Sequence, residues 1–121
     1  MAYVDGFVVA VPESRLADYK KLAKKAGKIW LEHGALEYVE CVADDVKPGK
    51  HTSFPQAVKL KHDEVVVFAW ITYRSRAHRD KVNRLVMADP FFAGMPPADM
   101  PFDGKRMIFG AFEPIVNLRS N

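Results

Sequence analysis

Residues 64–73, EVVVFAWITY, constrain the fold of this chain more than any other segment. β-branched and aromatic residues fill the segment without a turn-forming residue, which is typical of a β-strand. Both of its faces are apolar, with Val65, Val67, Ala69, Ile71 and Tyr73 on one and Val66, Phe68, Trp70 and Thr72 on the other. A strand with one solvated face alternates apolar and polar residues. Because this segment does not alternate, we expect both faces of its sheet to be covered.

Three other segments have the composition of strands, and two have the periodicity of helices. We predict strands at 3–11, 35–43 and 105–113, and helices at 15–33 and 76–88, where apolar residues recur every three or four positions. The order βαββαβ predicts an α+β fold, a ferredoxin-like sandwich that spans 1–121 as a single domain. Its four-stranded antiparallel sheet is expected in the order 4-1-3-2, with both helices on one face.

Residues typical of helix ends stand at the predicted boundaries. Ser14 and Ser75 precede the two helices and are expected to cap them. Gly34 follows the first helix, at a position where glycine commonly ends a helix.

Two long connections join these elements. Residues 46–62 are polar, and Thr52 or Ser53 is expected to cap a short helical turn within them. Residues 88–104 contain four prolines, which exclude a regular helix or a central strand. The aromatic and methionine side chains of this second connection either close over a cavity or seal the edge of a dimer.

The second face of the sheet needs a cover that the two helices cannot supply. Left exposed, it would form an apolar patch larger than soluble monomers usually carry. A second copy packed sheet to sheet buries such a patch, at roughly 800 Å² per subunit in an ordinary interface. We therefore expect a homodimer with twofold symmetry, formed through the sheet face.

Composition and charge narrow the class of protein. Hydrophobic residues make up 49% of the chain and charged residues 27%, as in ordinary globular proteins. The single cysteine, Cys41, excludes an internal disulfide, and the apolar run near the N-terminus is too short to span a bilayer. We expect a cytoplasmic protein with no membrane partner.

The lysines of the first predicted helix make RNA an alternative partner. Five of them share one face of this helix: Lys20, Lys21, Lys24, Lys25 and Lys28. The face has no aromatic residues between the lysines, and the net charge of +3 is lower than that of dedicated nucleic-acid binders. A solvated helix face is the more usual meaning of such lysines.

Asp5 is the first candidate catalytic residue, because it interrupts an apolar strand. A buried carboxylate can be tuned for proton transfer by its surroundings. The structural alternative is that Asp5 pairs with the backbone or with a cation such as Lys105 or Arg106, since the first and last strands are expected to be neighbours.

Two histidines are further candidates for general acid–base chemistry. His33 ends the apolar face of the first helix, and His78 begins that of the second. The alternative for each is a hydrogen bond at a helix end, at the margin of the core.

The remaining titratable residues give weaker signals. Glu37 and Glu40 lie at an odd spacing in one strand, so they face opposite ways, and one of them is expected to face a pocket. Cys41 is most simply a small buried residue. No set of His, Cys, Asp and Glu residues has the spacing of metal ligands, so we expect no metal site and no cofactor.

Aromatic residues and one arginine are candidate ligand-binding groups. Trp30, Tyr38 and Trp70 could stack on a flat ligand, or they could be ordinary core residues. Arg106 follows Asp103-Gly104, which has the composition of a tight turn. We interpret this stretch as structural first, with Arg106 as a possible anion anchor.

Several long motifs resemble a bacterial family of YbaA-like proteins, which is known only as a domain of unknown function. They are MAYVDGFVVAVP, HGALEYVEC, TSFPQAVKLK, DEVVVFAWI, MADP and MPFDGKRMIFGAFE, and together they cover about residues 1–113. The resemblance implies a dimeric α/β barrel, the fold of antibiotic-biosynthesis monooxygenases and muconolactone isomerases. It implies no established activity.

Two functions of different class follow. The first is a homodimer that binds a small apolar or aromatic ligand, with cofactor-independent monooxygenase or isomerase chemistry based on Asp5, His33 or His78. The alternative is a non-enzymatic dimer that interacts with RNA or with another protein.

Overall fold

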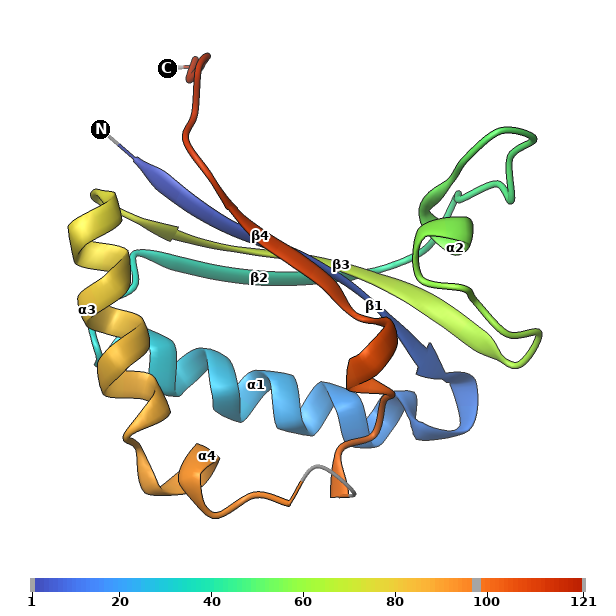
Figure 1. The fold of residues 1–121 in the computed structure, drawn as a ribbon, viewed down its shortest axis with the longest axis horizontal. Helices are drawn as coiled ribbons and strands as arrows, with labels where there is room; N and C mark the ends of the chain where they lie inside the picture. The colour runs from blue at the N-terminus through green and yellow to red at the C-terminus, as the bar shows by residue number, and fades with distance from the viewer. Residues whose placement is uncertain (1, 97–98, 121) are drawn as a thin grey trace.

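A four-stranded antiparallel sheet with two long helices on one of its faces forms the framework of the protein (Figure 1). The computed structural model describes residues 2–96 and 99–120. The strands are β1 (Tyr3–Pro12), β2 (Glu37–Val42), β3 (Glu64–Tyr73) and β4 (Ile108–Phe112), in the spatial order β2-β3-β1-β4. The long helices are α1 (Leu16–Glu32) and α3 (Arg76–Met87). The predicted ferredoxin-like α+β fold and strand order are confirmed.

Short helical segments join these elements. They are η1 (Glu13–Arg15), α2 (Phe54–Ala57), α4 (Pro90–Ala93) and η3 (Gly104–Arg106). Segment α4 begins after Asp89, whose side chain accepts a hydrogen bond from the Phe91 backbone N–H. The proline-rich connection therefore contains a short helical turn at Pro90–Ala93, with Pro90 in its first turn, where it costs no hydrogen bond. Within residues 2–96 and 99–120, no helix has both the length and the hydropathy to cross a membrane.

The register of the two central strands determines which side chains face the helices. β1 and β3 pair along their whole length, from Tyr3 opposite Tyr73 to Pro12 opposite Glu64. β4 pairs with β1 on its other side, with Phe7 opposite Phe109. Since side chains alternate across a strand, the odd-numbered residues of β1 and β3 face α1 and α3.

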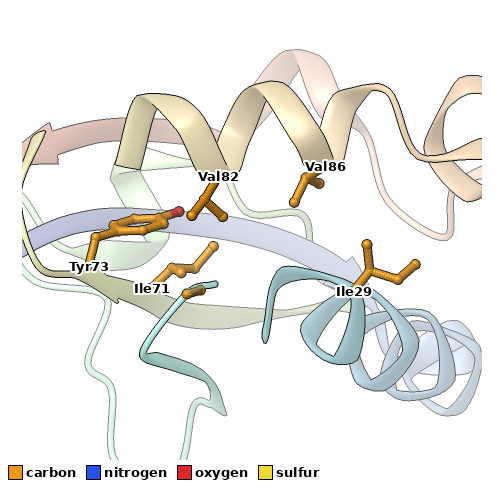
Figure 2. Packing of buried hydrophobic residues seen from close by; sticks show 6 residues of the cluster. Ile29, Ile71, Tyr73, Val82 and Val86 are labelled. Carbon is orange, nitrogen blue, oxygen red and sulfur yellow. The ribbon is translucent and has the colours of Figure 1, made fainter. Parts of the chain in front are cut away.

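The core lies between this face of the sheet and the two helices. Figure 2 shows Ile71 and Tyr73 of β3 directed toward Val82 and Val86 of α3, with Ile29 of α1 beside them. A second group closes the other end of the layer, around Val9, Val11, Tyr19 and Val67. Each buried aliphatic side chain of this kind contributes about 1.5–3 kcal/mol to folding.

The helix ends were predicted with mixed success. Ser75 and Ser53 cap α3 and α2, each accepting a hydrogen bond from the backbone N–H three residues later. Gly34 ends α1 with a φ of +115°, which glycine adopts readily. The prediction for Ser14 was wrong, because the chain enters α1 through η1 and Arg15 stands at the N-cap without a side-chain cap.

The second face of the sheet is covered at one end by the chain itself. Val58, which follows α2, is fully buried against Val8, Ala10 and Val66. The connection predicted as polar therefore supplies part of the cover that we assigned to a second subunit. The rest of this face stays exposed around Phe68, Ile108 and Phe112.

Arg106 is part of the framework rather than of a strand. Its guanidinium forms a bidentate pair with Glu64, at 2.7 and 2.6 Å, and also donates to Asp103 and to the Lys59 carbonyl. The pair is buried, with Glu64 and Arg106 side chains 4% and 13% exposed. Asp5 was predicted to pair with the backbone or with a cation; a cation does pair with it, but it is Arg79 and neither Lys105 nor Arg106, the two suggested examples.

The turn before β4 delays the start of this strand. Asp103 accepts a hydrogen bond from the Lys105 backbone N–H at 3.0 Å, and residues 104–106 form η3. The strand therefore begins at Ile108, three residues later than predicted. Asp103-Gly104 is a turn, as its composition indicated.

Removing the Glu64 charge should lower the free energy of unfolding at pH 7 and reduce its loss between pH 7 and pH 3. The hydrogen bond from Arg106 lowers the pKa of Glu64, so its stabilisation is complete above pH 5 and is lost as the pH falls through that lowered pKa. For Glu64→Gln we expect a loss of about 3 kcal/mol at pH 7, because one partner of a buried pair is left uncompensated. Urea unfolding at pH 7 and pH 3 measures both effects.

The matched control is Asp63→Asn, at an exposed neighbouring position. It should leave the unfolding curve at pH 7 almost unchanged. Equal stability of Glu64→Gln and the wild type at pH 7 would contradict the structural role of this pair.

Candidate functional site

A half-open cavity of about 430 Å³ lies between the helix-facing side of the sheet and the helices. This volume is within the range of small-molecule sites. We call it the inner cavity. Its apolar wall includes Phe7, Trp30, Ile71, Phe92, Phe102 and Phe109. Residues from every strand and from α1, α3 and the 88–107 connection contribute to it.

One polar group in this cavity is built around Asp5 of β1. Arg79 of α3 donates from Nε to Oδ1 of Asp5 at 3.0 Å, and its Nη2 also lies 3.0 Å from this oxygen. Tyr73 donates to Asp5 at 2.9 Å. The hydrogen bond with Asp5 raises the pKa of Arg79, so the arginine stays charged and neutralises the carboxylate.

Neighbouring side chains extend this polar group. The indole Nε1–H of Trp30 is 3.2 Å from both the Tyr73 hydroxyl and the Asn83 side-chain oxygen. Burial, and then the charge of Asp5, raises the pKa of Tyr73, which keeps its hydroxyl as a donor. Trp30 is thus held in place by its polar edge while its ring lies against Tyr38 and Phe92.

A second polar group is built around Glu40 of β2. Tyr19 of α1 donates its hydroxyl hydrogen to Oε1 of Glu40, and Tyr38 donates to Oε2 at 2.5 Å. Burial raises the pKa of Tyr19 and of Tyr38, and the charge of Glu40 raises both further. Both phenols therefore remain protonated donors at neutral pH. Among the residues that the structure describes, no lysine, arginine or histidine forms an ion pair with Glu40.

A glycine in α1 makes room for Tyr38. A Cβ atom on Gly27 would lie 2.7 Å from Cδ1 of the Tyr38 ring, closer than real contacts allow. Glycine inside a helix costs about 0.5–1 kcal/mol relative to alanine. This cost is explained by the close approach of the Tyr38 ring, which positions its hydroxyl at Glu40.

Three of the predicted site residues meet in the inner cavity. Asp5, Trp30 and Tyr38 all line it. His33 instead lies 3.2 Å from Asp89, at the joint between α1 and α4. His78 accepts a hydrogen bond from the Arg74 backbone N–H, and neither histidine lines the cavity.

Two other predicted ligand-binding residues lie elsewhere. Trp70 is on the opposite face of the sheet, where it donates to Glu37 at 2.9 Å. Arg106 is engaged by Glu64 and Asp103 and does not line the inner cavity. The prediction that Glu37 and Glu40 face opposite ways is confirmed.

The cavity also contains polar residues that the sequence reasoning did not select. These are Tyr19, Arg79 and Asn83. For Glu40, the sequence predicted only that either it or Glu37 faces a pocket. The sequence could have identified Arg79 and Asn83 of α3, because both share the helix face of the buried Val82 and Val86. A polar residue on an apolar helix face needs a partner, and here that partner is Asp5.

No group of three or more His, Cys, Asp or Glu side chains within residues 2–96 and 99–120 is arranged to hold a metal ion. The polar side chains that line the cavity are carboxylates, phenols, an amide, an indole and a guanidinium.

Comparison with known sequences identifies the family. The model of the family described as "Protein of unknown function (DUF1428)" matches residues 2–104. The "Uncharacterized protein YbaA" of Escherichia coli (strain K12) is 50% identical over 117 residues, which cover 97% of this chain and 99% of that protein. The chain therefore belongs to the DUF1428 family, and the resemblance drawn from its motifs is confirmed.

Solved structures show the same fold at low sequence identity. A NIPSNAP domain protein from Burkholderia xenovorans aligns with a TM-score of 0.56 and 13% identity, over 98% of this chain and 99% of its own. A dimeric ferredoxin-like protein from an uncultured marine organism aligns with a TM-score of 0.56 and 14% identity, over 99% and 100%. The likeness is one of fold alone.

The substitution Gly27→Ala should destabilise the protein, against the usual trend. Alanine in a helix interior normally adds about 1 kcal/mol of stability relative to glycine. Here its Cβ would displace the Tyr38 ring, so we expect a loss of about 1–3 kcal/mol from overpacking. Urea unfolding measures this, and Gly104→Ala is the control, because no atom lies within 4 Å of a Cβ there. A stabilised Gly27→Ala variant would contradict the packing described.

Proposed function

We propose that this DUF1428 protein is a homodimer in which each subunit binds a small, flat, largely apolar molecule in its inner cavity. The observation that carries the proposal is the composition of the cavity wall. Aromatic and aliphatic side chains form most of it, and two compact polar groups, around Asp5 and Glu40, interrupt it. Small-molecule sites commonly combine an apolar wall with a few well-placed polar groups.

The aromatic residues suggest the shape of the ligand. Trp30 packs edge-on against Phe92 at a ring distance of 5.3 Å and is tilted against Tyr38 at 5.8 Å. Phe109 stands at the sheet edge, 77% exposed although it lines the cavity. An exposed aromatic ring at this position would be covered by a bound ligand, which makes Phe109 a mouth residue.

The opposite face of the sheet supports the homodimer. Phe68, Ile108 and Phe112 are exposed there, and beyond β4 the chain extends away from the sheet with Ile115 95% exposed (Figure 1). Large apolar side chains exposed on one face of a sheet favour an interface there. A second copy of this chain is the occupant we propose, and a protein of the same fold is described as dimeric.

The activity that we propose is cofactor-independent and takes place in the cytoplasm. The polar groups of the cavity offer carboxylates and neutral hydrogen-bond donors, which suit proton transfer. Isomerisation needs no further reactant, whereas a monooxygenase also needs molecular oxygen. We therefore favour an isomerase.

Substitutions of two phenylalanines of β4 test ligand binding and dimerisation separately. Phe109 lines the cavity, and Phe112 lies on the opposite face and is 62% exposed. With 2-methoxynaphthalene as a neutral probe, we expect Phe109→Ala to weaken binding about tenfold while the dimer remains intact. A tenfold loss corresponds to about 1.4 kcal/mol, which is within the contribution of a partly buried aromatic ring.

Phe112→Ala is the matched variant and should behave in the opposite way. It should weaken dimerisation at least tenfold, because an aromatic anchor is removed from the interface, and leave probe affinity unchanged. Fluorescence titration gives the affinity, and sedimentation equilibrium gives the dimer dissociation constant. A wild-type protein that is monomeric, or that binds no probe, would overturn the corresponding half of the proposal.

A further inference from the structure

Glu40 lines two separate cavities of the protein. It lines the inner cavity and also an outer groove of about 630 Å³ between α1 and the edge strand β2. Tyr19 and Tyr38, its two phenol partners, line both spaces as well. The outer groove is bordered by the exposed Lys20 and Lys24. One carboxylate therefore borders both the ligand space and a groove on the lysine-bearing side of α1.

The Glu40 carboxylate keeps free capacity for a ligand. A carboxylate offers about four lone-pair positions on two oxygens. Tyr19 occupies one position on Oε1, and Tyr38 occupies one on Oε2. Each oxygen can thus accept one further hydrogen bond, and a ligand in the inner cavity can donate it.

Charge defines which ligands suit this site. The charged residues that line the inner cavity are Asp5, Arg79 and Glu40. Asp5 and Arg79 neutralise each other as an ion pair, which leaves one negative charge at Glu40. An anionic ligand would be repelled, whereas a neutral molecule with an acidic hydrogen can donate to the carboxylate.

We propose that Glu40 is the proton-accepting group of the inner cavity, and that its substrates are neutral, flat carbonyl compounds or phenols with an acidic C–H or O–H. This inference rests on the proposed function, because it requires a ligand in the inner cavity. Tyr19 and Tyr38 are positioning residues that hold the carboxylate toward the ligand.

The chemical step is a proton shift that needs no other reactant. Glu40 removes a proton from a carbon next to the carbonyl, the C–H electron pair becomes a C=C bond, and the carbonyl π pair moves to oxygen as an enolate. Returning the proton from Glu40 to another carbon of the conjugated system completes an isomerisation. Electrons and atoms balance, and no oxidant is consumed.

The other polar group offers further hydrogen-bond donors to the far end of a ligand. Asp5 and Tyr38 both lie opposite Ile71 in the sheet, so the strands that carry the two polar groups are about 10 Å apart, or two strand spacings. Arg79 and Asn83 line the cavity at the Asp5 side and carry N–H donors. A flat conjugated molecule can bridge this distance, with its acidic hydrogen and the neighbouring oxygen near Glu40 and its far end against Arg79 and Asn83.

The first test uses 2-naphthol, a neutral phenol that becomes a strong acid when excited, together with 2-methoxynaphthalene, which lacks the O–H. Bound to the wild type, 2-naphthol should emit as naphtholate, because Glu40 takes its proton. Bound to Glu40→Gln, which preserves size and an acceptor oxygen for one tyrosine, it should emit as naphthol. Glu37→Gln, on the same strand but the opposite face, should behave as the wild type.

The outcomes separate this inference from the binding proposal. Equal binding of 2-methoxynaphthalene to all three proteins shows that the cavity is intact. Naphtholate emission that persists in Glu40→Gln, or that is missing in the wild type, would overturn the role of Glu40 and leave the binding proposal standing. Failure of both probes to bind the wild type would overturn both.

A second measurement tests the reaction itself. The neutral ketone 2-tetralone exchanges its α-hydrogens in deuterated water, and proton NMR follows the rate. We expect the wild type to accelerate this exchange about 100-fold more than Glu40→Gln does, at the lower end of general-base catalysis. Equal rates for the two proteins would contradict the proposal.

Discussion

The pairing of β1 with β3 is the constraint on which the rest of the structure depends. The ten paired positions decide which side chains of the two central strands face the helices. A slip of one residue would turn every side chain to the other face. Asp5 would then lie on the open face, and Gly6 would replace it beside Arg79. The ion pair of Asp5, the core around Tyr73 and the polar side of the cavity thus all follow from a single register.

The two carboxylates of the cavity have different surroundings. We therefore assign Asp5 a structural role and propose a chemical one for Glu40. Asp5 faces a guanidinium and a phenol, which satisfy it and neutralise its charge. The hydrogen bonds that the structure gives Glu40 within residues 2–96 and 99–120 come from two phenols, which hold the carboxylate without neutralising it. Gly27 supports this arrangement from α1 by leaving space for the Tyr38 ring. The site is therefore positioned by close packing between α1 and β2 as much as by its polar contacts.

The fold was predictable because its signals are local, and the site was less so because its contacts are not. Strand composition and helix periodicity indicated the βαββαβ succession, which predicted the strand order. Ser53, Ser75 and Gly34 act at the helix ends as expected. Ion-pair partners join distant segments, so Lys105 and Arg106 were suggested as cations for Asp5, whereas its partner is Arg79 on α3. Alternation along β2 indicated that one glutamate faces a pocket, but only the arrangement of α1 identifies it as Glu40. The burial of Val58 was missed because that connection is polar in composition.

The two tryptophans report on the two faces of the sheet, since Trp30 lines the inner cavity and Trp70 lies on the opposite face. The most direct test of a ligand site between sheet and helices is therefore an NMR titration of the two indole N–H signals with 2-methoxynaphthalene. The account predicts that the Trp30 signal shifts with the probe while the Trp70 signal stays in place. A shift of Trp70 alone, or of neither signal, would contradict it.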